Sequence, residues 1–246
     1  MTIWAISDLH LAFGVPSKTM EAFGPAWKQY AERIAHAWKE RIQADDLVLI
    51  PGDISWAMKL EQAMPDLCWI DQLPGTKLIL RGNHDYWWSS AAKLEKALPP
   101  SIHFIHNNAF TWKDYTFGGT RLWDTAEYQF GKYIQFQENP LAKPQEIQPA
   151  EEEKIFAREL ERLTISLKQL NPQARVRIAL THYPPIGADL LPSRASALLE
   201  TFKIDHCVFG HLHNVRLGEL PFGEARGVRY HFTSCDYLEF IPTRII

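Results

Sequence analysis

Five short polar motifs, each directly after an apolar run, carry the side chains that could do chemistry in this 246-residue chain. They read Asp8-Leu9-His10, Gly52-Asp53, Gly82-Asn83-His84-Asp85, Thr181-His182 and Gly210-His211-Leu212-His213. Asp, Asn and His are ligands of hard and borderline divalent metals. The motifs supply seven candidate ligands: Asp8, His10, Asp53, Asn83, His182, His211 and His213. Seven ligands suggest a site for two metal ions, an arrangement that assists chemistry at phosphate.

The spacing within the motifs suits neighbouring ligands. Asp8 and His10 occupy alternate positions, so on an extended segment both side chains point the same way. Asp53 follows a glycine that tolerates a tight turn, and its two carboxylate oxygens can bridge two cations. His211 and His213 repeat the alternate spacing, although they could also be divided between two ions.

Strands and helices alternate along the chain and must position these motifs. Short apolar runs at 3–6, 47–50, 77–80, 176–180 and 207–209 predict strands buried on both faces. Apolar residues spaced by three and four predict helices within 27–42 and 156–170. The alternation predicts an α/β layered fold, in which ligands bind beyond the carboxyl ends of the strands. Because each motif follows a strand, five loops leaving one edge of a sheet can converge on one point.

The region 119–148 departs from this pattern, because about thirty residues show no clear periodicity. We expect a lid or insertion that selects substrate, with a surface excursion packed by its own aromatic residues as the alternative. Segments 110–117 and 228–233 alternate like hairpin strands. No Gly-, Ser- or Pro-rich linker divides the chain, so one domain is expected over residues 1–246.

Composition limits the partners and the compartment. A net charge of -3 provides no basic surface, so stable nucleic-acid binding is not expected. Three scattered cysteines agree with a reducing compartment. No signal peptide is apparent and no apolar run approaches the roughly 20 residues that span a bilayer. We expect a cytoplasmic protein without a membrane span; the sequence indicates no oligomeric state.

The five motifs, in this order, resemble those of the calcineurin-like metallophosphoesterase superfamily, whose pattern is DxH, GDxx, GNH[DE], a single His and GHxH. The resemblance extends from Asp8 to His213. It implies a four-layer α/β/β/α sandwich of two mixed sheets flanked by helices, with a dinuclear metal site at the carboxyl ends of the strands. It implies one metal held by Asp8, His10, Asp53 and His213. It implies a second metal held by Asp53, Asn83, His182 and His211, with Asp53 as the bridge.

The chemistry implied by this resemblance is hydrolysis of a phosphate ester by a metal-bridging hydroxide. Two cations neutralise the anionic ester and lower the pKa of the attacking water. His84 would face the substrate and stabilise or protonate oxygen, and Asp85 would orient its ring. The expected substrate is a small phosphorylated molecule, a phosphodiester or a monoester. Mn²⁺ is the expected ion, and the same ligands suit Fe, Zn, Co and Ni.

Two other functions within the superfamily are weighed against this one. A non-catalytic metal-binding scaffold would fit a chain that had lost ligands, whereas all seven and His84 are present. A UDP-diacylglucosamine-type pyrophosphatase commonly carries Arg at the position of His84, which disfavours that substrate here. Hydrolysis of a non-phosphate bond is a third alternative, separable by testing aryl esters beside aryl phosphates.

Residues around the motifs leave further alternatives open. Arg81 and Arg121 could grip a phosphate through a bidentate fork or pair with a structural carboxylate. The remaining histidines are expected at the surface or in packing: His36, His103, His106, His206 and His231. Five aromatic residues near the motifs favour a rim that supports the ligand loops over a wall that stacks on substrate. They are Trp56, Tyr86, Trp87, Trp88 and Trp123.

Overall fold

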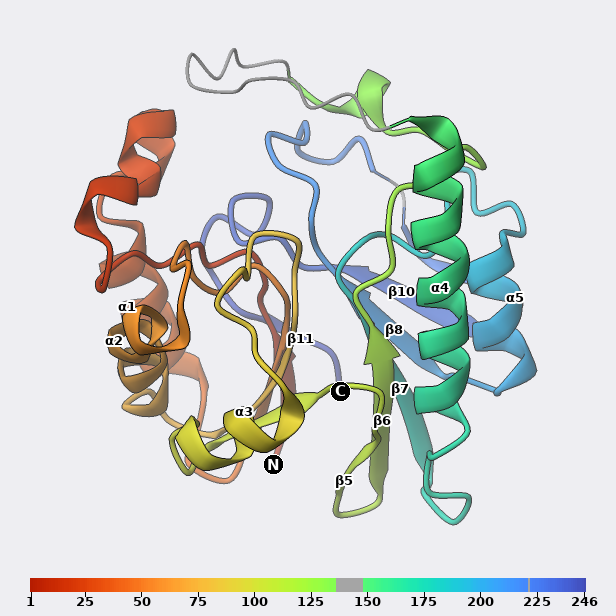
Figure 1. The fold of residues 1–246 in the computed structure, drawn as a ribbon, viewed down its shortest axis with the longest axis horizontal. Helices are drawn as coiled ribbons and strands as arrows, with labels where there is room; N and C mark the ends of the chain where they lie inside the picture. The colour runs from red at the N-terminus through yellow and green to blue at the C-terminus, as the bar shows by residue number, and fades with distance from the viewer. Residues whose placement is uncertain (136–147, 221) are drawn as a thin grey trace.

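The protein consists of two sheets packed face to face, with helices on both outer sides (Figure 1). The structure is a computed structural model that describes residues 1–135, 148–220 and 222–246. In Figure 1, helices α1 (Tyr30–Arg41) and α2 (Leu60–Asp71) lie on the left. Helices α4 (Pro149–Leu167) and α5 (Arg194–Thr201) lie on the right. The predicted α/β/β/α sandwich is therefore confirmed.

The first sheet has five strands. In spatial order they are β11 (Thr243–Arg244), β1 (Ile3–Ala5), β2 (Leu47–Pro51), β3 (Thr76–Leu80) and β4 (Ile102–Ile105). Strands β1 to β4 are parallel, and only the edge strand β11 is antiparallel to its neighbour. Leu49 on β2 pairs with Ala5 on one side and with Leu78 on the other, which fixes the register.

The second sheet has six strands. In spatial order they are β5 (Phe110–Trp112), β6 (Tyr115–Thr120), β7 (Val176–Thr181), β8 (His206–Phe209), β10 (Val228–Phe232) and β9 (Glu224–Ala225). The central four are parallel, and β5 and β9 form antiparallel hairpins at the edges. Both hairpins predicted from alternating residues are confirmed, and both sheets are mixed.

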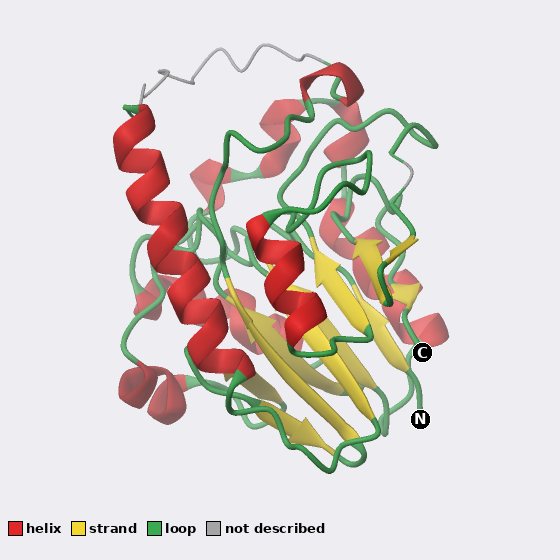
Figure 2. Ribbon diagram, turned by 90° about the vertical axis from the view of Figure 1, so that its right-hand side faces the viewer, coloured by secondary structure: helices red, strands yellow, loops and turns green. Residues whose placement is uncertain are grey.

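Strand β2 shows why continuous apolar runs build this sandwich. Successive side chains of a strand point to opposite faces. Leu47 and Leu49 join the apolar cluster between the two sheets. Val48 and Ile50 join the cluster that includes residues of α1 and α2. Strand β7 is built similarly, and a third cluster lies between the second sheet and α4 and α5. Both faces of the central strands are therefore buried (Figure 2).

The helices match the sequence periodicity. Helix α4 carries Glu151 and Glu152 in its first turn, where carboxylates complement the helix dipole. The short remaining helices are η1 (Pro16–Lys18), η2 (Met20–Phe23), η3 (Pro25–Trp27), α3 (Ala91–Ala97) and η4 (Gly131–Tyr133). Among the described residues, no helix is both long and apolar enough to cross a membrane.

Region 119–148 is described only in part. Residues 136–147 of the expected lid lie outside the described residues. Its start continues strand β6, its middle contains η4, and its last residue directly precedes α4. The intervening residues 121–130 form no helix or strand, as the missing periodicity predicted.

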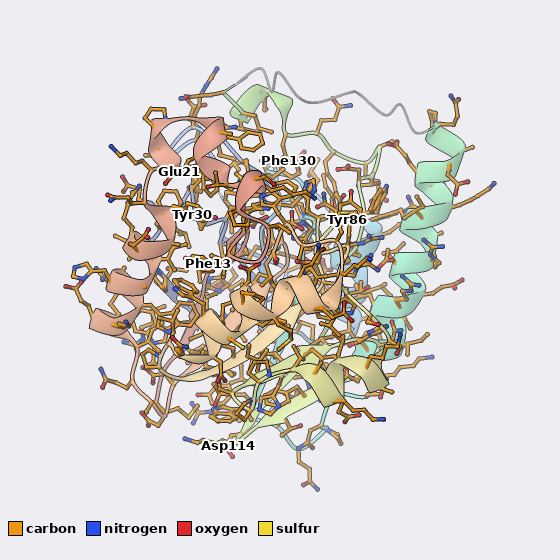
Figure 3. The ribbon with its side chains drawn as sticks, turned by 60° about the vertical axis from the view of Figure 1, so that its left-hand side comes forward. Phe13, Glu21, Tyr30, Tyr86, Asp114 and Phe130 are labelled. Atoms are coloured by element: carbon orange, nitrogen blue, oxygen red, sulfur yellow. The ribbon has the colours of Figure 1, made fainter. Side chains whose placement is uncertain are left out.

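The motif-bearing strands belong to two sheets, so the prediction that all five loops leave one sheet was wrong. Strands β1, β2 and β3 are in the first sheet, and β7 and β8 are in the second. The loops still converge, because the carboxyl ends of both sheets meet. Ser7 N, after β1, donates to Thr233 O, after β10, at 2.8 Å. In Figure 3, Tyr86 and Phe130 lie toward this edge, and Asp114, in the β5–β6 turn, lies at the opposite end.

Candidate metal centre

All seven predicted ligands come together where the carboxyl ends of the two sheets meet. Asp8 and His10 follow β1, Asp53 follows β2 and Asn83 follows β3. The second sheet supplies His182 at the end of β7, and His211 and His213 after β8. The site is deep, because the side chains of Asp8, His10, Asp53 and His182 are at most 2% exposed.

One group of donor atoms surrounds His10. Its Nε2 lies 3.1 Å from His213 Nε2 and 3.6 Å from Asp53 Oδ2. His213 Nε2 lies 3.7 Å from Asp8 Oδ1. Asp8, His10 and His213 therefore form a cluster with the spacing of metal ligands.

A second group of donor atoms surrounds His182. Its Nε2 lies 3.4 Å from Asp53 Oδ2 and 2.7 Å from Asn83 Oδ1. The same Asn83 oxygen lies 3.1 Å from His211 Nδ1. Asp53 Oδ2 faces both groups, which is the position that a bridging carboxylate requires.

The protonation of His182 tests whether these atoms suit a cation. His182 Nδ1 lies 3.0 Å from the carbonyl oxygen of Pro51, so this nitrogen must be the donor. In the neutral ring Nε2 then carries a lone pair, and it faces the lone pairs of Asn83 Oδ1. Burial alone would lower the pKa of His182, but Asp53 and Asp8 outweigh burial and raise it to about 9. The pocket thus favours a positive charge between these atoms, as a proton or a metal ion.

The distances also fit shared coordination. Two ligands each about 2.1 Å from one ion are about 3.0–3.4 Å apart in tetrahedral or octahedral geometry. The distances between neighbouring donors here run from 2.7 to 3.7 Å. Oxygen and imidazole donors at this spacing fit divalent transition metals, and the buried Asp and His clusters fit a dinuclear centre.

The backbone at the ligands is left-handed rather than extended. The φ angles are 58° at Asp8, 45° at His10, 51° at Asp53 and 75° at His211. The prediction that Asp8 and His10 alternate along an extended segment was therefore wrong, although both reach the site. Left-handed backbone is uncommon for residues other than glycine, and such strain collects at functional sites.

Two motif glycines make room for the ligands. A Cβ on Gly82 would lie 2.0 Å from Asp53 Oδ1, and a Cβ on Gly210 would lie 2.0 Å from Asp8 Oδ2. Any larger residue would displace a carboxylate. The glycines of GNHD and GHLH are thus explained by close approach.

Three residues that hold the ligands were missed by the sequence analysis. Asp236 Oδ1 lies 3.0 Å from His213 Nδ1 and fixes that nitrogen as the donor, which leaves Nε2 for the site. Ser7 Oγ and Ser234 Oγ donate to Asp8 Oδ2 at 2.5 and 3.0 Å. Ser234 and Asp236 follow β10, so applying the strand-end rule to that predicted strand would have found them.

Asp85 has different partners from those expected. Its Oδ1 accepts from the backbone N–H groups of Ile54 and Ser55 and from Trp87 Nε1, at 2.9–3.1 Å. Its Oδ2 accepts from Gly82 N at 2.8 Å. Among the described residues Asp85 makes no hydrogen bond to the His84 ring. It is fully buried and joins the Asp53 loop to the Asn83 loop, so its contacts do not support the expected ring-orienting role.

His84 lies at the edge of the site. Its backbone N donates to Asp53 Oδ1 at 2.8 Å, and its ring centre lies 4.5 Å from that of Trp56. Trp56 also stacks on His10 at 4.7 Å. Burial lowers the pKa of His84 although the Asp53 carboxylate opposes this, so the ring is neutral near pH 7.

The neighbouring aromatic residues divide into two groups. Trp56 and Trp87 support the ligand loops, as the rim interpretation expects. Trp123 instead helps to line a pocket of about 430 Å³ beside His211. Tyr128 and Phe130, from the described part of region 119–148, line the same pocket. That region therefore forms a wall next to the candidate metal centre.

Two solved structures share this fold. Phosphopantetheinyl hydrolase (PptH) from Mycobacterium tuberculosis is 15% identical with a TM-score of 0.52, over 100% of this chain and 95% of that one. A protein of unknown function, AQ665 from Aquifex aeolicus, is 13% identical with a TM-score of 0.50, over 99% of this chain and 95% of that one. At such identities the likeness shows the fold alone.

Two viral proteins match part of the sequence. The gene 66 protein of Mycobacterium phage D29 is 32% identical over 83 residues, which are 34% of this chain and 40% of the phage protein. Its counterpart in Mycobacterium phage L5 is 36% identical over 84 residues, or 33% of this chain and 39% of the phage protein. This chain thus matches about two fifths of the length of each.

The family match covers most of the chain and every motif. Residues 1–215 match the family described as calcineurin-like phosphoesterase, and this range includes all candidate ligands from Asp8 to His213. The match agrees with the two-sheet sandwich and with the buried clusters of Asp and His. The chain belongs to the calcineurin-like phosphoesterase family.

Proposed function

We propose that this protein hydrolyses a phosphate ester with two divalent metal ions. The observation that carries the proposal is the position of Asp53 Oδ2, which lies 3.6 Å from His10 Nε2 and 3.4 Å from His182 Nε2. Asp8, His10, Asp53 and His213 would hold one ion. Asp53, Asn83, His182 and His211 would hold the other.

The ions and the side chains would have separate tasks. Bound ions would supply positive charge to the anionic ester and acidify an attacking water. Asp53 would bridge the two ions, and its second oxygen, Oδ1, accepts a hydrogen bond from the backbone N–H of His84 at 2.8 Å. This contact ties the backbone of the substrate-facing loop to the bridging ligand, and the His84 ring packs against Trp56.

We assign to His84 the contact with the reacting phosphate. A neutral imidazole can donate its N–H to a phosphoryl oxygen or to the leaving oxygen, and the lowered pKa of His84 keeps the ring neutral at pH 7. Asp85 would act as a positioning residue through four hydrogen bonds to the loops around it.

The finer parts of the proposal concern the substrate and the setting. We propose a small-molecule phosphodiester or monoester as substrate and Mn²⁺ as the native ion. We further propose that the chain works as one domain over residues 1–246 in the cytoplasm. The residues that face the centre support a small substrate, because aromatic side chains of the 430 Å³ pocket lie directly beside His211.

Hydrolysis of 4-nitrophenyl phosphate and bis(4-nitrophenyl) phosphate by the Mn²⁺-loaded protein tests this function. Asp53→Asn should abolish most of the activity. His84→Ala should reduce kcat roughly 10²- to 10⁴-fold while two metals stay bound. Asp114→Asn is the matched control, because Asp114 is exposed at the opposite end of the molecule. Loss of both metals from His84→Ala would contradict the role given to His84.

A further inference from the structure

A second polar cleft lies beside the candidate metal centre, where β3 and β4 of the first sheet face β6 of the second. Its residues include Arg81 after β3, His106 after β4 and Arg121 after β6, and α4 contributes Glu159 and Arg162. The cleft has a volume of about 90 Å³. This is room for several waters or one small oxyanion.

Positive charge exceeds negative charge in this cleft. Glu159 is 1% exposed and is already satisfied. Its carboxylate oxygens accept from Arg162 Nη1 at 2.6 Å and from Thr120 Oγ1 at 2.7 Å, and Arg121 Nη2 lies 3.6 Å away. The cleft therefore holds three guanidinium groups and one carboxylate, and that carboxylate pairs with only two of them.

Arg81 is the unpaired member of the three. Among the described residues, no carboxylate lies within ion-pair distance of it, and its buried Nε has no acceptor. A buried charged donor without a partner is costly, and an anion in the cleft would satisfy it. Arg121, in contrast, does pair with a structural carboxylate, and its guanidinium lies 4.5 Å from the ring centre of Trp123.

His106 adds a neutral donor, although from the sequence it was expected at the surface or in packing. Its Nδ1 accepts from Trp88 Nε1 at 3.1 Å, so Nε2 carries the hydrogen in the neutral ring. Burial lowers the pKa of His106, and the positive charges of Arg162 and Arg81 lower it further. The cleft thus offers guanidinium and imidazole donors, the set that recognises phosphate oxygens.

Two residues of the cleft adjoin the ligand loops through the backbone. Arg81 directly precedes Gly82 of the GNHD motif. The backbone carbonyl of Arg121 accepts from the N–H groups of His182 and Tyr183, at 3.1 and 2.9 Å. The loops that carry Arg81 and Arg121 are therefore tied directly to the loops that carry the candidate ligands.

We propose that this cleft binds a second phosphate group. Given the proposed function, the substrate class is then a small molecule with two phosphate groups, one at the metals and one against Arg81 and Arg162. Free inorganic phosphate is the other source of the same chemistry. The competing explanation is that the arginines only neutralise Glu159.

Counting bound phosphate tests the cleft without relying on turnover. In equilibrium dialysis of the Mn²⁺-loaded protein with radiolabelled inorganic phosphate, the wild type should bind two per chain. Arg162→Gln and Arg81→Gln should bind one, with metal content and thermal unfolding measured in parallel. Arg158→Gln is the matched control, because Arg158 is exposed on the same helix, and it should still bind two.

The binding outcomes separate this proposal from the proposed function. If the metal centre took no phosphate, the wild type would bind one, and Arg162→Gln would lose it. A single phosphate that persists in both arginine variants would overturn the cleft as an anion site. If Arg81→Gln disturbs the neighbouring GNHD motif, Arg162→Gln still gives a decisive result, because Arg162 lies on α4 and outside the motifs.

A substrate series then identifies the source of the second phosphate. The values of kcat/KM would be compared between the monophosphate of one nucleoside and bisphosphates of the same nucleoside that differ in the spacing of their two phosphates. A charge-assisted contact predicts that the best bisphosphate is preferred roughly 10-fold or more. The preference should disappear in Arg162→Gln and persist in Arg158→Gln. Two bound phosphates without any substrate preference would assign the cleft to free phosphate. The absence of both a preference and a second bound phosphate would overturn the proposal.

Discussion

Replacing Gly82 by alanine should disable the metal centre through one methyl group. Gly82 belongs to the loop that carries Asn83 and His84, and it packs directly against Asp53. An added Cβ would lie 2.0 Å from Asp53 Oδ1 and 2.3 Å from Asp53 N. Because one of these atoms is backbone, rotating the Asp53 side chain cannot relieve the clash.

The size of the effect follows from these distances. Ordinary van der Waals contact begins near 3.4 Å, so the Cβ and the backbone nitrogen of Asp53, 2.3 Å apart, must separate by about 1.1 Å. A misplacement of about 1 Å at reacting groups costs about 100-fold in rate. We therefore expect kcat/KM to fall at least about 100-fold, or about 2.7 kcal/mol of transition-state stabilisation. Overpacking should also lower the free energy of unfolding by about 1–3 kcal/mol.

The assay combines metal content by mass spectrometry, Mn²⁺-dependent hydrolysis of an aryl phosphate, and urea unfolding. Gly223→Ala is the matched control, since a Cβ there meets no atom of the described residues within 4 Å and its φ is not in the left-handed range. That variant should match the wild type in all three measurements. A Gly82→Ala protein that binds two metals and retains kcat/KM within about twofold would refute the reasoning.

Three further predictions concern other parts of the molecule. Asp236→Ala should lower the affinity for one of the two metal ions roughly 10- to 100-fold, because His213 loses its orienting acceptor. Competition with a chromogenic chelator measures both affinities, and two unchanged values would contradict the prediction. Burial lowers the pKa of Lys77 to about 8, below the roughly 10.4 of an unfolded lysine, so its contribution to stability rises with pH between these values. Urea unfolding should therefore show the wild type gaining up to about 3 kcal/mol relative to Lys77→Met from pH 7 to pH 10, whereas a constant difference would refute the assignment. Phe130→Ala should change the preference among phosphate esters with different leaving groups and leave metal content unchanged; identical preferences would show that the aromatic pocket does not contact the substrate.

The layers of the fold could be predicted because burial on both faces is visible in single strands. The run at β2 is apolar at every position, and its alternate residues serve two different cores. The division of the strands between two sheets could not be predicted from such runs. Each run shows that a strand is covered, but not which strand pairs with it. Only the family resemblance predicted two sheets.

The ligands could be predicted because each motif is local, whereas their supports are distant in the sequence. Asp236 contacts His213 only because β10 runs beside β8. The left-handed φ angles of Asp8 and His10 depend on how their loop packs against the Asp53 loop, with His10 N donating to Asp53 O at 2.9 Å. The role of Arg81 stays open in the sequence, because only the fold shows that Glu159 pairs with the other two arginines.

The central claim is that two metal ions at the convergence of the sheets hydrolyse a phosphate ester. The most direct measurement is release of 4-nitrophenol from bis(4-nitrophenyl) phosphate and 4-nitrophenyl phosphate by chelator-treated protein titrated with Mn²⁺. We predict no release without metal and a rise that saturates at two ions per chain. Equal rates with and without metal, or no hydrolysis of either ester by protein that holds two ions, would contradict the claim.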